Sequence, residues 1–324
     1  MADRIKSPFG PYTDARDVVA GQDLTGKVAI VTGGATGIGI ETTRALAEVG
    51  ADVVIAVRKP DLAEAAVADI KKTAKGEVSW SMLDLSSFKS IRAFAERWGD
   101  RPLNLLINNA GVMACPLAYT EDGLEMQIGT NHFGHFLLSV LLAPNLMEGS
   151  KSGWGSRLVS LSSIGHRRAP MNFDDPHFRS HPYDKWEAYG QAKTANALFA
   201  VGFDKRFKDP NGTGGVRAFA VMPGGIMTPL QRHLPLEEQK AMGWIDDDGK
   251  VRDGFKTPQQ GASTSVWAAV GAELDDVGGL YLEDLAQAVP WSPEHPWSGV
   301  MPHALDPEAA DRLWTLSVET TGAG

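Results

Sequence analysis

Short runs of apolar residues alternate with longer segments of helical period along most of the chain. The runs have the length of strands and are nearly continuous in hydrophobicity, as strands buried on both faces are. They predict strands over residues 28–32, 53–57, 78–83, 103–108, 157–162 and 216–222. The periodic segments between them predict helices over 41–49, 61–74, 87–98, 123–147 and 186–207.

A strand–helix alternation of this length predicts the fold class. Right-handed crossovers place the helices on both faces of a parallel sheet, so we expect an α/β protein with a doubly wound parallel sheet, the Rossmann fold. A chain of 324 residues with 43% hydrophobic composition can bury one such core without splitting. We therefore expect a single domain over 25–324, preceded by an N-terminal extension over 1–24.

The stretch 229–256 departs from the strand–helix pattern of the rest of the chain. Apolar residues such as Leu230, Leu234 and Trp244 are interspersed with charges, and three aspartates before Gly249 supply a turn. We expect this segment to cover a substrate cleft. The alternative is an ordinary surface excursion with a small hydrophobic underside.

Composition narrows the class of protein. The formal net charge of -9 argues against binding to a phosphate backbone, so nucleic acid is not an expected partner. A single cysteine, Cys115, leaves no internal disulfide framework and favours a reducing setting. The N-terminus lacks the apolar region of a signal peptide, and no stretch has about 18 consecutive apolar residues. We expect a soluble, cytoplasmic protein without a membrane span.

A glycine-rich turn follows the first predicted strand directly. Residues 32–39 read Thr-Gly-Gly-Ala-Thr-Gly-Ile-Gly and run straight into a helical segment. Glycines let the backbone approach a pyrophosphate closely, and a helix start presents unpaired N–H groups and its positive dipole end to that anion. The spacing departs from the usual G-x-G-x-x-G, and a purely structural turn is the alternative. In this context the turn predicts a dinucleotide site.

The end of the second predicted strand bears on the choice of cofactor. An acid at this place commonly accepts hydrogen bonds from the adenosine ribose of NAD, but here the strand ends with Arg58 and Lys59. A guanidinium offers planar, charge-assisted hydrogen bonds to a 2′-phosphate. Arg58 therefore favours NADP(H), the alternative being a solvated strand end.

Tyr189 and Lys193 stand four residues apart on a predicted helix and so share one face. A phenol with a pKa of about 10 is a poor base at neutral pH, but a nearby ammonium favours the phenolate. Lowering the pKa by about three units requires roughly 4 kcal/mol of differential stabilisation. Spacing alone fits an ordinary surface helix equally well, so the pair gains meaning only with other motifs.

Those motifs occur in a fixed order along the chain. After the glycine turn come Asn-Asn-Ala-Gly at 108–111, Ser162-Ser163, and then Tyr189 with Lys193. As a set they resemble the short-chain dehydrogenase/reductase family over roughly residues 24–228, and more loosely in Gly-Gly-Leu-Tyr at 278–281. The lead sequence at 21–27, the basic Arg58 and Gly-Val-Met at 111–113 resemble its retinol dehydrogenase-like subgroup.

The resemblance implies a role for each motif residue. Ser163 would bind the substrate oxygen, Tyr189 would donate or accept the proton, and Lys193 would bind the nicotinamide ribose and lower the tyrosine pKa. Asn131 would support the lysine through a proton relay. The implied cofactor-binding set is Gly33, Thr36, Gly37, Ile38, Gly39, Arg58, Asp84, Leu85, Asn109, Ala110, Gly111, Tyr189, Lys193, Pro223, Gly224 and Thr228.

Several of these assignments have a plainer alternative. Asp84 could cap a strand end, Asn131 could make a helix hydrogen bond, and Ser162 rather than Ser163 could be the working hydroxyl. His132 and His135 lie three residues apart without a nearby acid, so we expect packed helix residues and no metal site.

The expected activity is hydride transfer between NADP(H) and a hydrophobic aldehyde, ketone or alcohol, as the subgroup implies, by a protein that forms a homo-oligomer. Four apolar residues between the serines and the tyrosine could form the substrate wall or could equally be local packing: Met171, Phe173, Phe178 and Trp186. A non-catalytic cofactor-sensing or interaction protein on the same fold is the alternative, because fold alone does not establish chemistry. An isomerase or dehydratase is a third hypothesis.

Overall fold

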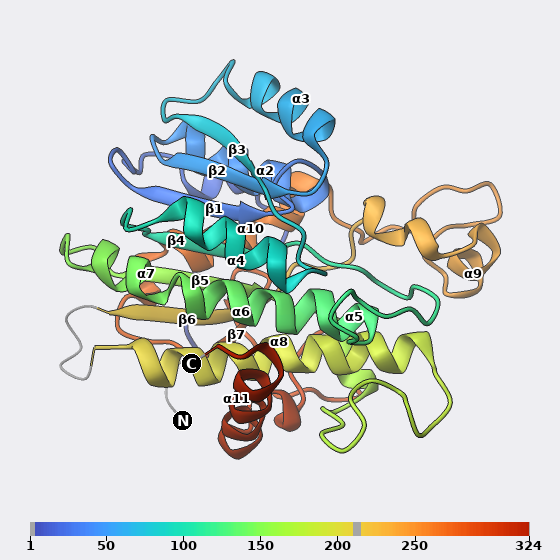
Figure 1. Cartoon of the computed structure of the whole chain (residues 1–324). Helices are drawn as coiled ribbons and strands as arrows, with labels where there is room; N and C mark the ends of the chain where they lie inside the picture. Colours follow the sequence, from blue (N-terminus) through green and yellow to red (C-terminus); the bar gives the residue numbers. More distant parts are fainter. Residues whose placement is uncertain (1–3, 210–214, 324) are drawn as a thin grey trace.

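The computed structural model describes residues 4–209 and 215–323. The described residues form one sheet of eight strands in the order β3-β2-β1-β4-β5-β6-β7-β8, parallel up to β7 and antiparallel between β7 and β8 (Figure 1). The strands are β1 (Val28–Thr32), β2 (Asp52–Val57), β3 (Val78–Met82), β4 (Leu105–Asn108), β5 (Ser156–Leu161), β6 (Val216–Met222), β7 (Leu280–Glu283) and β8 (Ala286–Gln287).

Helices cover both faces of the sheet (Figure 1). One face carries α1 (Ala15–Val18), α2 (Gly37–Glu48), α3 (Pro60–Ile70) and α10 (Pro258–Val270). The other carries α4 (Phe88–Trp98), α6 (Gly134–Leu141), α7 (Ala143–Ser150) and α8 (Lys185–Phe207), with α11 (Pro307–Thr321) packed on α8. The predicted single Rossmann-type domain is therefore confirmed.

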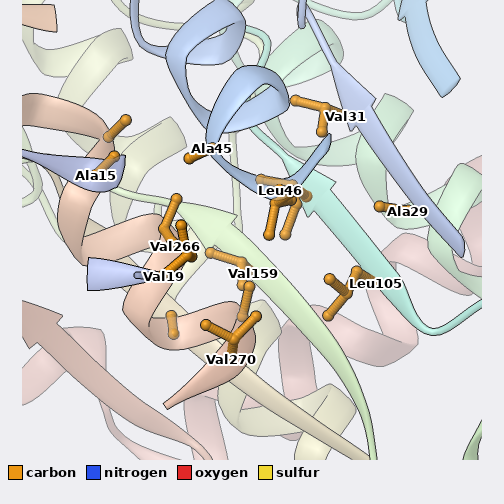
Figure 2. Close-up of a cluster of buried hydrophobic side chains, with 14 of the residues drawn as sticks. Ala15, Val19, Ala29, Val31, Ala45, Leu46, Leu105, Val159, Val266 and Val270 are labelled. Atoms are coloured by element: carbon orange, nitrogen blue, oxygen red, sulfur yellow. The ribbon is translucent and has the colours of Figure 1, made fainter. Parts of the chain in front are cut away.

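The inner strands are buried on both sides, which explains their continuous hydrophobic runs. Figure 2 shows the core on the first face, where Leu46 of α2 and Val266 of α10 approach side chains of β1, β4 and β5. Fully burying one such side chain contributes roughly 1.5–3 kcal/mol. Small residues such as Ala29 and Ala45 let the helices lie close to the sheet.

The six predicted strands all form, with ends that shift by at most two residues. The helix predicted over 123–147 is divided into α5 (Met126–Ile128), a π-helical turn at Gly129–Phe133, α6 and α7. The break between α6 and α7 falls at Leu142, whose ψ of 1° is not helical, just before a proline in the first turn of α7. Periodicity alone does not show these interruptions because the apolar stripe continues across them.

The N-terminal residues, which lie outside the predicted strand–helix alternation, pack against the C-terminal part of the fold. The segment from Lys6 to Ser7 bonds to Ala286 and Leu285 beside β8, and α1 packs on α10. Residues 4–24 are thus joined to the C-terminal part of the sheet in space.

The strand order reverses between β1 and β4, which are neighbours in the sheet. In doubly wound sheets, ligands bind in the crevice outside the carboxyl ends of the strands at such a switch point. Residues 229–256 start after β6 and contain α9 (Leu236–Ala241), which projects from the body of the molecule (Figure 1). Within the described ranges, no helix combines the length and apolar character that crossing a bilayer requires.

Candidate active site

A cleft of about 1640 Å³ opens at the carboxyl ends of the strands. A pocket for a single small molecule measures roughly 300–1,000 Å³, so this cleft has room for a dinucleotide together with a substrate. Every residue of the implied cofactor-binding set lines it, as does Ser163, whereas Asn131 does not. The fold thus brings together motifs that span 196 positions of sequence, from Gly33 to Thr228.

The glycine turn forms a tight cradle at the start of α2. Gly33 and Gly37 have φ of +65° and +57°, a conformation that favours glycine. A Cβ on Gly39 would lie 2.3 Å from the Gly33 carbonyl oxygen, so a side chain cannot fit there. The residues of the first helical turn, whose N–H groups have no partner within the helix, line this space, as an anion site requires. Thr228 closes the turn, with its Cβ 3.4 Å from where a Gly37 Cβ would be.

The Asn-Asn-Ala-Gly segment is fixed to the end of β1 by one hydroxyl. Thr32 Oγ1 accepts hydrogen bonds from the backbone N–H groups of Asn109 (2.9 Å) and Ala110 (3.0 Å). Its proton has two acceptors in reach, the Ile107 carbonyl at 3.3 Å and Nε2 of His135 at 2.9 Å, while Nδ1 of His135 lies 2.9 Å from the Asn131 carbonyl. Burial lowers the pKa of His135 to about 4, consistent with a neutral ring in this chain of hydrogen bonds.

The end of the cleft beside β2 and β3 carries both an arginine and an aspartate. Arg58 is exposed at the end of β2, and no ion pair within 4–209 and 215–323 involves it. Asp84 accepts hydrogen bonds from the Ser86 backbone (2.9 Å) and hydroxyl (2.6 Å), so its carboxylate also has the turn-capping role that we weighed against adenine contact.

Tyr189 and Lys193 lie on α8 with their side chains in the cleft wall, and each is 4% exposed. The Lys193 ammonium donates a 2.8 Å hydrogen bond to the Leu161 carbonyl at the end of β5 and sits 5.6 Å from the centre of the Tyr189 ring. The backbone of Gly165 passes directly beneath this ring, where a Cβ would come within 2.8 Å of Cδ1. Helix and loop together therefore fix the phenol.

Burial dominates the protonation of both groups. It raises the pKa of Tyr189 to about 12 and lowers the pKa of Lys193 to about 8, while the Ser163 hydroxyl lowers the Tyr189 value in part. The expectation that Lys193 lowers the tyrosine pKa stays a prediction. Desolvation penalises the phenolate and the ammonium alike, and the ammonium bonds to a backbone carbonyl and lies beside the ring.

The two serines after β5 have different environments. The Ser162 hydroxyl is buried and donates a 2.7 Å hydrogen bond to the Lys193 carbonyl within α8. The Ser163 hydroxyl is half-buried, accepts a 3.0 Å hydrogen bond from the Gly165 N–H, and interacts with Tyr189. Of the two, Ser163 has the geometry to meet a substrate oxygen.

Asn131 sits in the π-helical turn, a departure that is frequent at functional sites. Its amide accepts a 2.8 Å hydrogen bond from the Val112 N–H and donates one of 2.9 Å to the Val112 carbonyl. A Cβ on Gly111 would lie 3.1 Å from its Oδ1 and 3.8 Å from the Lys193 Nζ. The Asn131 side chain therefore fixes the loop at Gly111 and Val112 in front of Lys193. Both of its hydrogen bonds go to that loop and not to its own helix.

Segment 229–256 is docked on the start of α8. Glu238 of α9 accepts hydrogen bonds from the Lys185 ammonium (2.6 Å) and the Trp186 indole (3.1 Å). An apolar cluster beneath it contains Leu234 with Met113 and Tyr189, and partly buried Trp186, Leu230 and Trp244 pack against them. The segment thus forms one wall of the cleft directly beside the tyrosine.

Of the four residues weighed as a substrate wall, Trp186 lines the cleft and the others do not. Met171 and Phe173 pack with α8 and α11, and the Phe178 ring makes a tilted contact with His181 and an edge contact with Tyr183. Local packing is therefore the role of these three. The rest of the apolar cleft wall comes from residues far away in sequence, such as Met113, Leu230 and Trp244. The interval between the serines and the tyrosine could not identify them.

Two further cleft residues escaped the sequence analysis. Trp297 is 66% exposed at the cleft mouth, and the Arg252 guanidinium of segment 229–256 lies 5.6 Å from the centre of its ring. The sequence Pro-Trp-Ser occurs twice, at 290–292 and 296–298, and this repeat marks the loop that carries Trp297. The repeat alone does not show that the loop reaches the cleft.

The lone cysteine is not activated. Cys115 is buried, and desolvation raises the pKa of its thiol to about 11. A thiol with this pKa is a poor nucleophile near neutral pH.

Comparisons with known proteins agree with this geometry. Residues 27–174 match the family model described as short chain dehydrogenase. A Streptomyces lividans protein named "Probable oxidoreductase" is 46% identical over 93% of this chain and 100% of its own length. Retinol dehydrogenase 13 of Homo sapiens is 38% identical over 92% of this chain and 86% of its own.

A solved structure is also similar across almost the whole chain. An uncharacterised protein from Mycobacterium paratuberculosis has a TM-score of 0.71 and 32% sequence identity, covering 94% of this chain and 97% of that one. The likeness extends beyond the matched family model and includes the C-terminal part of the sheet.

Proposed function

The chain belongs to the short-chain dehydrogenase/reductase family and is retinol dehydrogenase-like within it, and we propose that it transfers hydride between NADP(H) and an apolar carbonyl compound or alcohol. The observation that carries this proposal is the meeting of Ser163, Tyr189 and Lys193 at one wall of a cleft whose other end is the glycine cradle.

The cleft fits a dinucleotide because its glycine cradle excludes side chains and presents a helix start. In the proposal, Gly33, Thr36, Gly37, Ile38 and Gly39 hold the pyrophosphate, and Thr228 closes over it. Asp84 and Leu85 flank the adenine. Asn109, Ala110, Gly111, Pro223 and Gly224 hold the nicotinamide half. When bound, the nicotinamide supplies or accepts the hydride.

The proposed preference for NADP(H) rests on Arg58. Its guanidinium is exposed at the cleft edge, where it is free to bind a 2′-phosphate through charge-assisted hydrogen bonds.

Proton transfer is assigned to Tyr189, with the substrate oxygen held between its hydroxyl and that of Ser163. Because burial keeps the phenol protonated at neutral pH, the resting enzyme is prepared to donate a proton to the oxygen of a carbonyl substrate. Lys193 stands beside the ring, where its charge stabilises the phenolate left after that step. Asn131 positions the loop at Gly111 and Val112 in front of the lysine.

The proposed substrate is apolar because the cleft beside Tyr189 is walled by hydrophobic side chains, chiefly Met113, Trp186 and Trp244. Residues 229–256 form the covering wall, and α9 holds it through Glu238. The name of the human relative, a retinol dehydrogenase, fits a long apolar alcohol.

The test is the consumption of NADPH, followed by absorbance at the nicotinamide band, with a panel of aldehydes and ketones of increasing apolar chain length. We expect turnover that improves with apolar character. Binding of NADPH without its consumption by any member would favour a non-catalytic, cofactor-sensing protein instead. Product formation without net change in NADPH would point to an isomerase or dehydratase.

A further inference from the structure

The backbone carbonyl of Ser163 receives an unusual number of hydrogen bonds. The N–H of His166 donates to it over 3.0 Å, Nδ1 of His166 lies at 2.7 Å, and the Tyr281 hydroxyl donates over 3.1 Å. A carbonyl oxygen has two lone pairs, so three donors hold it firmly from different directions. The residue that bears the working hydroxyl is thus fixed through its own backbone.

The hydrogen bonds of His166 define its tautomer. Nε2 accepts from the backbone N–H of Met301 over 3.1 Å, so the proton of the ring is on Nδ1 and points to the Ser163 carbonyl. The side chain is fully buried, and desolvation lowers its pKa to about 4, which keeps the ring neutral. Since Nδ1 is a donor, the Tyr281 hydroxyl 3.1 Å from it cannot donate there and is directed to the carbonyl instead.

These two side chains come from separate parts of the fold. Tyr281 lies on β7, where it is 1% exposed and pairs in register with Ala220 of β6. His166 is in the 3-10 turn at Ile164–Arg168, and its own carbonyl lies 3.0 Å from Nε2 of His303. The Thr194 hydroxyl on α8 lies between this carbonyl, at 3.0 Å, and the carbonyl that ends the turn at Ala169, at 2.7 Å. The serine is therefore braced against β7, α8 and the segment around residues 301–303.

The same turn also positions the tyrosine. Gly165 donates its N–H to the Ser163 hydroxyl oxygen and packs beneath the Tyr189 ring. A shift of the turn would move the serine hydroxyl relative to the phenol, and a misplacement of about 1 Å can cost 10²-fold in rate.

We propose that Tyr281 and His166 are positioning residues for the reaction, which act through the Ser163 carbonyl to hold the serine hydroxyl at the distance from Tyr189 that the substrate oxygen requires. Neither side chain touches the reacting atoms. The inference rests on the proposed function, because it takes Ser163 as the group that binds the substrate oxygen.

A double-mutant cycle tests this role. Tyr281→Phe removes the hydroxyl that bonds to the carbonyl and retains the buried ring. We expect kcat to fall by about fivefold to twentyfold, with the Kd for NADPH unchanged. In a Ser163→Ala background the same change should have almost no further effect on kcat, because the hydroxyl that Tyr281 positions is already absent. Tyr119→Phe, whose hydroxyl is at the surface and bonds to His177, is the matched control and should leave kcat unchanged.

If Tyr281→Phe lowers kcat by the same factor in the wild-type and Ser163→Ala backgrounds, the proposal is overturned. The Tyr281 hydroxyl would then only stabilise the fold in general. An unchanged kcat for Tyr281→Phe in the wild-type background would overturn it as well. Full activity of Ser163→Ala would instead remove the serine assignment in the proposed function, and the inference with it.

A second readout does not depend on turnover. The His166 N–H bonds to the Ser163 carbonyl, and the Gly165 N–H bonds to the hydroxyl, so both amides report on this turn. Hydrogen exchange of these two amides should be faster in Tyr281→Phe than in the wild type, by about fivefold or more. Unchanged exchange would overturn the inference even if no substrate in the panel is turned over.

Discussion

The ammonium of Lys193 donates a 2.8 Å hydrogen bond to the carbonyl of Leu161 and lies 5.6 Å from the centre of the Tyr189 ring. This contact is one of several that tie α8 to the end of β5, and it places a positive charge beside the phenol. Among residues 4–209 and 215–323, no carboxylate forms an ion pair with this lysine. Burial lowers the pKa of Lys193, so the charged form costs folding stability near neutral pH.

We predict that Lys193→Met raises the free energy of unfolding at pH 7 by about 1–3 kcal/mol while it abolishes turnover. The pKa of Lys193 is about 8 in the folded protein, below its usual 10.5, so the unfolded chain binds more protons between these values. Wild-type stability should thus rise between pH 8 and 10.5, and the advantage of the variant should shrink there. Urea unfolding at pH 7 and pH 10 measures both.

Lys89→Met, at an exposed position on α4, is the control and should change stability little. A Lys193→Met protein that is less stable than the wild type at pH 7 would show that the ammonium contributes to folding.

Three buried histidines predict a loss of stability in mild acid. Burial lowers the pKa of His132 to about 3 and the pKa of His135 and His166 to about 4, from about 6.5. The unfolded chain binds protons at these residues as pH falls below 6.5 and the folded protein does not, so stability decreases as the pH falls from 6.5 toward 4. The Tm should fall steadily over this range in calorimetry.

His132→Phe should make that decline shallower, because the ring packs among Phe133, Phe136 and Phe199 and one titrating group is lost. The same Tm at pH 4.5 as at pH 6.5 in the wild type would contradict the neutral, buried state of these rings.

Arg58 should decide between the two cofactors. Arg58→Ala should lower kcat/KM with NADPH by about 10- to 100-fold, because a charge-assisted contact with the 2′-phosphate is lost, and should leave kcat/KM with NADH nearly unchanged. Arg312→Ala on α11, an exposed arginine that pairs with Asp174, is the control and should affect neither. Equal losses with both cofactors would refute the proposed role.

Trp297 should contribute to binding of long apolar substrates. It is held at the cleft mouth by a braced loop, in which Arg167 donates to the Pro296 and Gly299 carbonyls, and Arg252 faces its ring. Trp297→Ala should raise KM by about 5- to 20-fold for the longest substrates, through loss of buried apolar area, and leave short ones unaffected. Steady-state kinetics across the chain-length panel measures this.

The matched control for that change is Trp154→Ala. Trp154 also lies under a cation, Lys27, but it does not line the cleft. If both tryptophan variants raise KM alike, or if Trp297→Ala acts equally on short substrates, the role at the cleft mouth is wrong.

Much of the fold could be predicted because buried parallel strands leave a signature in sequence. The run at 28–32 is apolar up to Thr32, and β1 forms over the same residues with neighbours on both sides. The helix at 123–147 was predicted as continuous because its stripe of apolar residues is unbroken. The π-helical turn that carries Asn131 depends on packing across the fold, where Gly134 meets the Leu85 carbonyl.

The candidate site was predictable where a short sequence motif gives both the functional residue and the helix or turn that positions it. Tyr189 and Lys193 share a helix face, and the glycine cradle follows its strand directly. The residues around them were not predictable. Tyr281 reaches the Ser163 carbonyl only through the pairing of β7 with β6, and Trp297 reaches the cleft only through the loop that follows β8. The effect of burial on the Tyr189 pKa also required the fold, since spacing does not reveal desolvation.

The most direct test of the account is the turnover of NADPH with the best substrate of the carbonyl panel by Tyr189→Phe. The change removes the one hydroxyl proposed to donate the proton and keeps the ring above Gly165, so kcat should fall by about 10³-fold or more with the Kd for NADPH unchanged. Turnover by Tyr189→Phe at a rate within about tenfold of the wild type would contradict the central claim that this phenol is the acid of the reaction.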